Sequence, residues 1–101
     1  MNQAQMMALK KMQAEMTKAQ EDLAATVVSG TAGGGAVTVD MTCDYHVSTV
    51  KLAPQAIDPE DAETLEDLLV VAINDAVAKA QDASSKRMSS LTGGLRIPGL
   101  M

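Results

Sequence analysis

The sequence predicts an α+β fold in which a long helix lies at each end of the chain and short strands lie between them. Apolar residues recur with a helical period over residues 2–25 and again over 58–87, whereas apolar and polar residues alternate over 36–42 and 46–52. At 101 residues the chain is long enough for one domain. Two long helices leave few residues for an internal core, so we expect a partner chain to complete the burial of apolar surface.

The first helix is predicted from a segment that lacks Gly and Pro. Its apolar and small side chains have the alternating three- and four-residue spacing of a helical seam. The seam is formed by Leu9, Met12, Met16, Ala19 and Leu23. Because methionine side chains adapt to irregular surfaces, packing within the chain or in a dimer is favoured over a copper site or a peptide-binding site.

A short first strand is predicted at residues 26–29, which are largely β-branched. The segment that follows, residues 30–35, consists mainly of Gly and is predicted to form the loop of a hairpin. It resembles a phosphate-binding loop only in composition, because a strand rather than a helix follows it and no Lys-Ser or Lys-Thr pair ends it.

Two further strands are predicted from the alternation of apolar and polar side chains. The second strand, residues 36–42, has one apolar face, which we expect to pack in the core or in a dimer interface. That face is formed by Val37, Val39 and Met41. A turn at residues 43–45 leads to the third strand, residues 46–52, and Pro54 ends the strand pairing.

The second helix is predicted to begin with Asp58 as its N-cap and Pro59 at its first helical position. Several acids follow, and they complement the helix dipole, so we interpret them as structural rather than as a metal or acid–base cluster. An apolar stripe continues to Ala80. The last turns, up to Arg87, are polar all round and are expected to project into solvent.

Residues 1–88 are predicted to form the single domain, and residues 89–101 a flexible apolar tail that contains Gly and Pro.

The pair Asn74-Asp75 interrupts the apolar stripe of the second helix, although neither residue is a good helix former. This favours a structural role for the pair, such as a hydrogen bond to the sheet or to a partner.

The net charge of −5 is distributed unevenly along the chain. Residues 1–20 carry three lysines and one glutamate, residues 79–101 carry four basic residues and one aspartate, and residues 21–78 carry eleven acids and one lysine. Basic segments at both ends suit contacts with phosphates, the main source of non-specific nucleic-acid affinity. The candidates are Lys10, Lys11, Lys18, Lys79, Lys86, Arg87 and Arg96. Asp82 lies one turn from both Lys79 and Lys86, so the prediction depends on Lys86 and Arg87 more than on Lys79.

The composition disfavours other functional classes. Tyr45 is the only aromatic residue, which argues against single-stranded binding by base stacking. Cys43 and His46 are the only possible nucleophile and base, and no third residue is evident to orient them, so no catalytic residue, metal site or cofactor is predicted. No apolar run approaches the ~20 residues that span a bilayer. We therefore expect a cytoplasmic protein with no membrane partner.

Residue patterns in both helices and in the tail carry a resemblance to a known family. The patterns are Met12-Gln13, Met16, Lys18, Gln20-Glu21 and Leu23 in the first helix, Leu65-Glu66-Asp67-Leu68, Ala72 and Asn74-Asp75-Ala76 in the second, and Met88, Leu91-Thr92-Gly93-Gly94 and Pro98-Gly99 after it. Together they resemble the YbaB/EbfC family of bacterial nucleoid-associated proteins. One position departs from the family: Cys43 stands where members usually carry Gly, in the turn between the second and third strands.

The resemblance implies an α-β-β-β-α protomer with a three-stranded antiparallel sheet. Two such protomers would form a homodimer through their sheets, with long helices that project like the arms of tweezers. The resemblance also implies binding of double-stranded DNA in the nucleoid with low sequence specificity. Such binding would alter DNA conformation and contribute to nucleoid organisation, DNA protection and gene regulation.

The alternative hypothesis is a protein-interaction scaffold without physiologically important DNA binding. In that case the Met-rich seam of the first helix and the apolar tail, residues 89–101, would bind a further protein partner. Loss of the partner on deletion of the tail, with negligible retention of DNA, would favour the scaffold.

Overall fold

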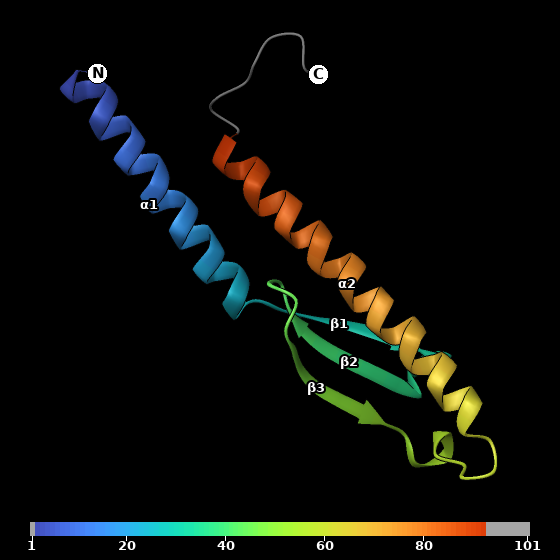
Figure 1. Ribbon diagram of the computed structural model, residues 1–101. Coiled ribbons are helices and arrows are strands. Elements are labelled where there is room, and N and C mark those ends of the chain that lie inside the picture. The colour runs from blue at the N-terminus through green and yellow to red at the C-terminus, as the bar shows by residue number, and fades with distance from the viewer. Residues whose placement is uncertain (1, 93–101) are drawn as a thin grey trace, which may run out of the picture.

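The computed structural model describes residues 2–92 and confirms the α-β-β-β-α order (Figure 1). Its two helices are α1 (Gln3–Ala25) and α2 (Ala62–Thr92), and its strands are β1 (Val27–Ala32), β2 (Val37–Thr42) and β3 (Val47–Leu52). Short 3-10 turns lie at Gly33–Gly35 and Pro54–Ala56. The strands form one antiparallel sheet in the order β1-β2-β3, so β1 and β3 are its edges.

The core lies between α2 and one face of the sheet. The inward face of β2 is fully covered, as predicted for its apolar residues, and small alanines of α2 pack against it. The core residues are Ala32, Val37, Val39, Met41, Ala72, Ala76 and Ala80. Alanines allow the helix backbone to approach the sheet closely, because no long side chain separates the two.

Gly30 lies inside β1 together with Thr31 and Ala32, so the prediction of a loop over residues 30–35 is wrong for its first three residues. A Cβ atom at Gly30 would meet the Ala72 carbonyl oxygen at 2.2 Å and the Ala76 nitrogen at 2.4 Å. Composition suggested a loop, whereas the glycine serves the close approach of the α2 backbone to the strand. The hairpin turn is formed by Gly33, Gly34 and Gly35, which have positive φ.

The second helix begins at Ala62, later than predicted, because Asp61 and not Asp58 caps it. The Thr64 hydroxyl donates to Asp61 Oδ2 at 2.7 Å, and the Thr64 amide to Asp61 Oδ1 at 3.4 Å. Asp58 instead closes the preceding turn, where its side chain accepts from the Glu60 amide at 3.0 Å. An Asp-Pro pair suits a turn as well as a helix start, which is why the sequence pointed to the wrong aspartate.

The C-terminal turns of α2 also differ from the prediction that they project into solvent. Arg87 and Met88 are half-buried, and the Arg87 guanidinium lies 3.0 Å from Asp22 Oδ2 near the end of α1. The helix continues through residues 89–92, which the sequence assigned to the tail. The rest of that predicted tail lies outside the described residues, and the division at residue 88 remains a prediction.

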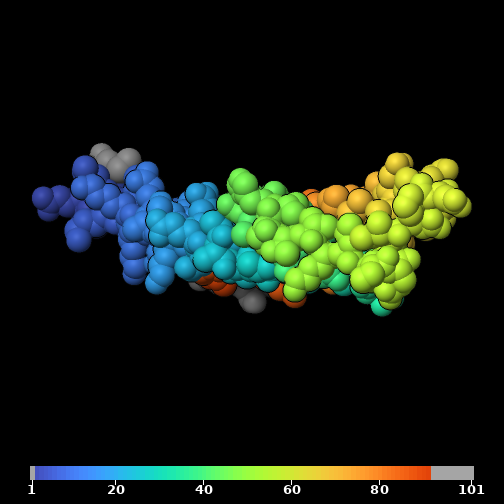
Figure 2. All heavy atoms as spheres, turned by 90° about the horizontal axis from the view of Figure 1, so that it is seen from below, coloured from blue at the N-terminus to red at the C-terminus, as the bar shows by residue number. Residues whose placement is uncertain are grey.

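Helix α1 packs only near its C-terminal end. Asn2 and Gln5 form a capping box at its start, with the Gln5 amide 2.8 Å from Asn2 Oδ1. Ala19 and Leu23 are buried, but the outer seam residues Leu9, Met12 and Met16 remain exposed. Figure 1 shows α1 leading away from the sheet, with the start of α1 and the end of α2 at the same end of the molecule. The molecule is elongated, measuring 68 × 28 × 16 Å, and Figure 2 shows α1 protruding at one end of it.

Candidate nucleic-acid interface

The lysines of α1 are exposed and have no bonded partner. Within residues 2–92, Lys10, Lys11 and Lys18 form neither an ion pair nor a side-chain hydrogen bond. The 3.6-residue period of the helix places all three outside the Met-rich seam. Their ammonium groups are therefore available to an external anion.

Each described cation of α2 has an acidic neighbour. Lys79 lies 3.2 Å from Asp75, Lys86 lies 2.9 Å from Asp82, and Arg87 is paired with Asp22 on α1. The Lys86–Asp82 pair is solvent-exposed, at 77% and 64% of the side chains, so it contributes little and Lys86 can exchange partners. Arg87 is only 32% exposed and is committed to Asp22. The seventh candidate, Arg96, lies outside the described residues.

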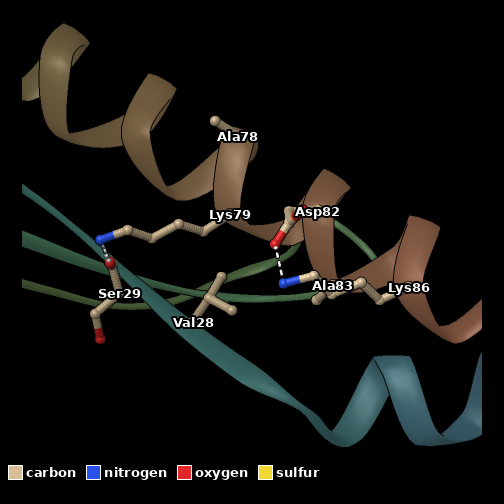
Figure 3. A pocket seen from close by; sticks show the side chains of 7 residues that line it. All are labelled: Val28, Ser29, Ala78, Lys79, Asp82, Ala83 and Lys86. Atoms are coloured by element: carbon tan, nitrogen blue, oxygen red, sulfur yellow. Dashed lines mark hydrogen bonds and ion pairs between the residues drawn. The ribbon is translucent and has the colours of Figure 1, made fainter.

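An open groove of about 570 Å³ runs between β1 and α2 (Figure 3). It is lined by Val28, Ser29, Ala78, Lys79, Asp82, Ala83 and Lys86. Figure 3 shows Lys79 extended to Ser29 and Asp82 directed at Lys86. Because the lysines in this groove are offset by carboxylates, it is a weaker candidate for phosphate contact than the outer surface of α1.

Asp75 bonds to the sheet, which confirms the structural role predicted for this interruption of the apolar stripe. Its Oδ2 atom accepts from the Thr31 amide at 3.0 Å. The pKa of Asp75 is lowered, first by the Thr31 N–H and then by the Lys79 ammonium, because both stabilise the charged form. The carboxylate is thus ionised at neutral pH and bonds α2 to the backbone of β1.

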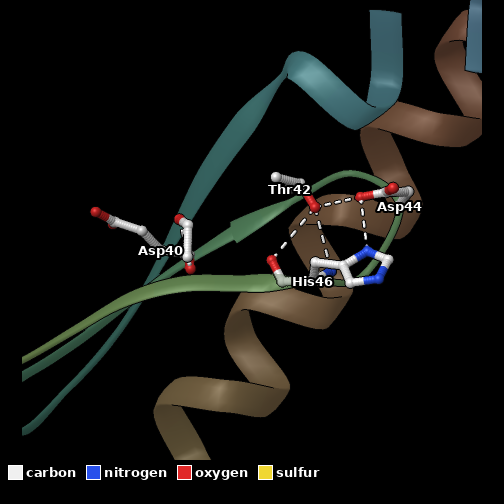
Figure 4. Close-up of polar contacts among 5 residues, drawn as sticks. Asp40, Thr42, Asp44 and His46 are labelled. Atoms are coloured by element: carbon white, nitrogen blue, oxygen red, sulfur yellow. Dashed lines mark hydrogen bonds and ion pairs between the residues drawn. The ribbon is translucent and has the colours of Figure 1, made fainter. Parts of the chain in front are cut away.

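The turn between β2 and β3 is closed by a polar network (Figure 4). The Thr42 hydroxyl donates to Asp44, and Asp44 Oδ1 lies 3.2 Å from His46 Nδ1. Hydrogen bonds from Thr42 and then His46 lower the pKa of Asp44. Tyr45 takes the left-handed conformation here, with φ of 71°. The network orders the turn, and its acid is satisfied within it.

Cys43 is buried beside this turn and is poorly suited to act as a nucleophile. Its amide donates to the Thr26 carbonyl at 2.9 Å, and burial, followed by the charge of Asp44, raises the pKa of its thiol. His46 is directed at Asp44. Since Cys43 does not have positive φ, the absence of Gly at this position costs no backbone strain. The described part of the chain contains no group of three or more His, Cys, Asp or Glu side chains placed to hold a metal ion.

β3 carries an apolar ledge, and sequence reasoning missed that this ledge is exposed. The ledge consists of Val47, Val50 and Leu52, which are 49%, 46% and 36% exposed. Val50 pairs with Val39, and Leu52 with Val37, so these residues lie on the core face of the sheet. Helix α2 packs on β1 and β2 and leaves this part of the face uncovered. The alternation of β3 predicted an apolar face, but it gave no sign that the covering helix stops short of it.

No helix within residues 2–92 is long and apolar enough to cross a membrane.

Comparisons with known proteins agree with this fold. A family model described as the YbaB/EbfC DNA-binding family matches residues 1–95. A nucleoid-associated protein of Chloroflexus aurantiacus is 54% identical over 97 residues, which cover 95% of this chain and 97% of that protein. A nucleoid-associated protein of Pelotomaculum thermopropionicum is 46% identical over 92 residues, with coverage of 91% and 88%. The crystal structure of an uncharacterised protein from Helicobacter pylori matches with a TM-score of 0.74 at 22% identity, covering 95% of this chain and 99% of that one.

Proposed function

The chain belongs to the YbaB/EbfC DNA-binding family, and from this premise we propose that it binds double-stranded DNA as a homodimer, through the exposed lysines of α1. The observation that carries the proposal is the contrast between the two helices. Lys10, Lys11 and Lys18 have no acidic partner within residues 2–92, whereas the described cations of α2 are matched by carboxylates. This moves the expected contact from the end of α2 to α1.

Low sequence specificity follows from the kind of side chain available. Ammonium groups on long stems contact phosphates and fix position, but they do not discriminate between bases. Tyr45 is the only aromatic residue, so stacking contributes little. The proposed role is that of a nucleoid protein in the bacterial cytoplasm, which changes DNA conformation and thereby contributes to nucleoid organisation, DNA protection and gene regulation.

Duplex binding is expected to weaken steeply with salt. If the six α1 lysines of a dimer all contact phosphates, the logarithm of the binding constant falls against the logarithm of salt concentration with a slope of about −5. Fluorescence anisotropy with a mixed-sequence duplex, titrated at several salt concentrations, measures the slope. A single-stranded oligonucleotide of the same sequence should compete weakly. Absence of binding to any duplex at low salt would remove the proposal.

The homodimer is supported by the apolar ledge and by the thin core of the single chain. Val47, Val50 and Leu52 extend the core face of the sheet past α2, where a second copy would bury them. Burial of apolar surface is the main driving force for such association. β3 is also an edge of the sheet, so the same contact can add backbone hydrogen bonds.

The substitution Val50→Lys is expected to separate the protomers without unfolding them. Val50 is 46% exposed in the single chain, so the fold tolerates the lysine, whereas burial of its charge in a dimer is costly. Analytical ultracentrifugation should show half the parent's mass. DNA affinity should fall although a positive charge is added, which excludes a simple charge effect. An unchanged mass would place the dimer contact elsewhere.

The scaffold alternative is favoured by one observation, the exposure of the Met-rich seam. Leu9, Met12 and Met16 form an apolar strip with no cover within residues 2–92. If the immobilised chain retained a partner protein and bound no duplex in the salt titration, the scaffold would replace DNA binding as the function.

A further inference from the structure

The two edges of the sheet differ in their contacts with side chains. Within residues 2–92, no side chain forms a hydrogen bond to the backbone of β3. At β1, in contrast, two side chains of α2 bond to the backbone in the middle of the strand. An uncovered edge presents free N–H and C=O groups that can pair with another strand. The contacts at β1 therefore bear on which edge is open.

The bonded groups of β1 are those that point away from β2. In an antiparallel pair, alternate residues direct both backbone groups to the neighbouring strand. Ser29 and Thr31 share one direction because they are two residues apart. Lys79 Nζ donates to the Ser29 carbonyl oxygen at 2.8 Å, and the Thr31 amide donates to Asp75 Oδ2 at 3.0 Å (Figure 3 shows Lys79). One backbone acceptor and one backbone donor on the outer edge of β1 are therefore already hydrogen-bonded to side chains of α2.

The close approach at Gly30 makes this closure possible. Gly30 lies between the two bonded residues, and the α2 backbone at Ala72 and Ala76 rests directly on it. Only at this separation does the short side chain of Asp75 reach the strand. The salt bridge between Asp75 and Lys79, 3.2 Å long, holds the two side chains together along the edge.

These contacts add little stability, because they are open to solvent. The side chains of Asp75 and Lys79 are 37% and 50% exposed, so water can satisfy the same backbone groups if they are removed. Water bound to these backbone groups would not, however, prevent another strand from pairing with β1. We infer that Asp75 and Lys79 are an edge guard, which prevents β1 of a second copy of this chain from pairing with β1 and leaves β3 as the open edge. The inference does not depend on DNA binding or on the proposed dimer.

The double variant Asp75→Ala, Lys79→Ala tests the guard by a gain of association. The matched control is Asp82→Ala, Lys86→Ala, which removes the same kind of pair from the same helix without touching the edge. Circular dichroism checks that each variant is folded. In ultracentrifugation the guard variant should form species of twice the parent's mass if the parent is a monomer, and of twice that mass or more if the parent is a dimer, because a dimer has two β1 edges. The control should match the parent.

Disulfide crosslinking locates the new contact. Ser29→Cys places a thiol on the exposed side of β1, while Cys43 is buried and contributes no crosslink. Under mild oxidation, Ser29→Cys should crosslink strongly in the guard variant and weakly in the parent and the control. A folded guard variant with the parent's mass and no crosslink would overturn the inference. If the double variant does not fold, Lys79→Ala, which leaves Asp75 on Thr31, carries the same test with the same two readouts.

Discussion

Replacing Gly30 with alanine is expected to lower the free energy of unfolding by more than about 3 kcal/mol, because the added methyl group overlaps the backbone of α2. The new Cβ would lie 2.2 Å from the Ala72 carbonyl oxygen and 2.4 Å from the Ala76 nitrogen. Backbone atoms in mid-helix do not yield locally, so α2 must move away from β1 as a body. That movement opens the only core of the described chain, and urea denaturation followed by circular dichroism measures its cost.

Gly34→Ala provides a control with the same chemical change. A Cβ at Gly34 meets no atom within 4 Å, but the residue has φ of +68°, so the cost is that of a left-handed alanine, about 1 kcal/mol. The two variants separate steric overlap from backbone strain, since Gly30 is not among the residues with positive φ. If Gly30→Ala lost no more stability than Gly34→Ala, α2 would not approach β1 as closely as the structure has it.

The periodicity of the sequence predicted the secondary structure, whereas it contained little information on which residues lie close together in space. Helical and alternating periods predicted both helices and the last two strands, and β-branched residues predicted the first strand, so the order of all five elements was predicted. Gly30 was assigned to a loop, since glycine in a strand is explained only by the backbone that approaches it. The start of α2 was misplaced because both Asp58 and Asp61 have the chemistry of a cap.

The basic residues show the same limit. Counting charges made all lysines and arginines near the chain ends candidates for phosphate contact and favoured Lys86 and Arg87 over Lys79. The partner of Arg87 is Asp22, 65 residues away, and no local pattern predicts that pair. Lys79 and Asp75, like Lys86 and Asp82, are four residues apart on one helix and form ion pairs, but Lys11 and Glu15, like Lys18 and Asp22, have the same spacing and form none within residues 2–92. Only the fold distinguishes the partnered cations from those of α1.

Neutralising the α1 lysines is expected to weaken duplex binding by at least about 100-fold near 0.1 M salt. In the variant Lys10→Gln, Lys11→Gln, Lys18→Gln, each lost phosphate contact should also reduce the salt slope by about 0.9. Glutamine keeps most of the side-chain length and is a good helix former, so α1 should remain intact. The anisotropy titration used for the parent measures both quantities, and circular dichroism checks the helix.

A charge-matched control decides whether position or total charge is responsible. Gln55→Glu, Asn74→Asp, Gln81→Glu adds three acids at exposed positions outside α1, so both variants change the net charge from −5 to −8. If α1 holds the contact surface, the control loses only the part of the affinity that comes from long-range repulsion, and its salt slope stays near the parent's. Equal losses in the two variants would show that net charge alone sets the affinity, and the assignment to α1 would be wrong.

A larger loss in Lys86→Gln than in the α1 variant would return the contact to the end of α2, where an exposed pair with Asp82 is weak enough to open.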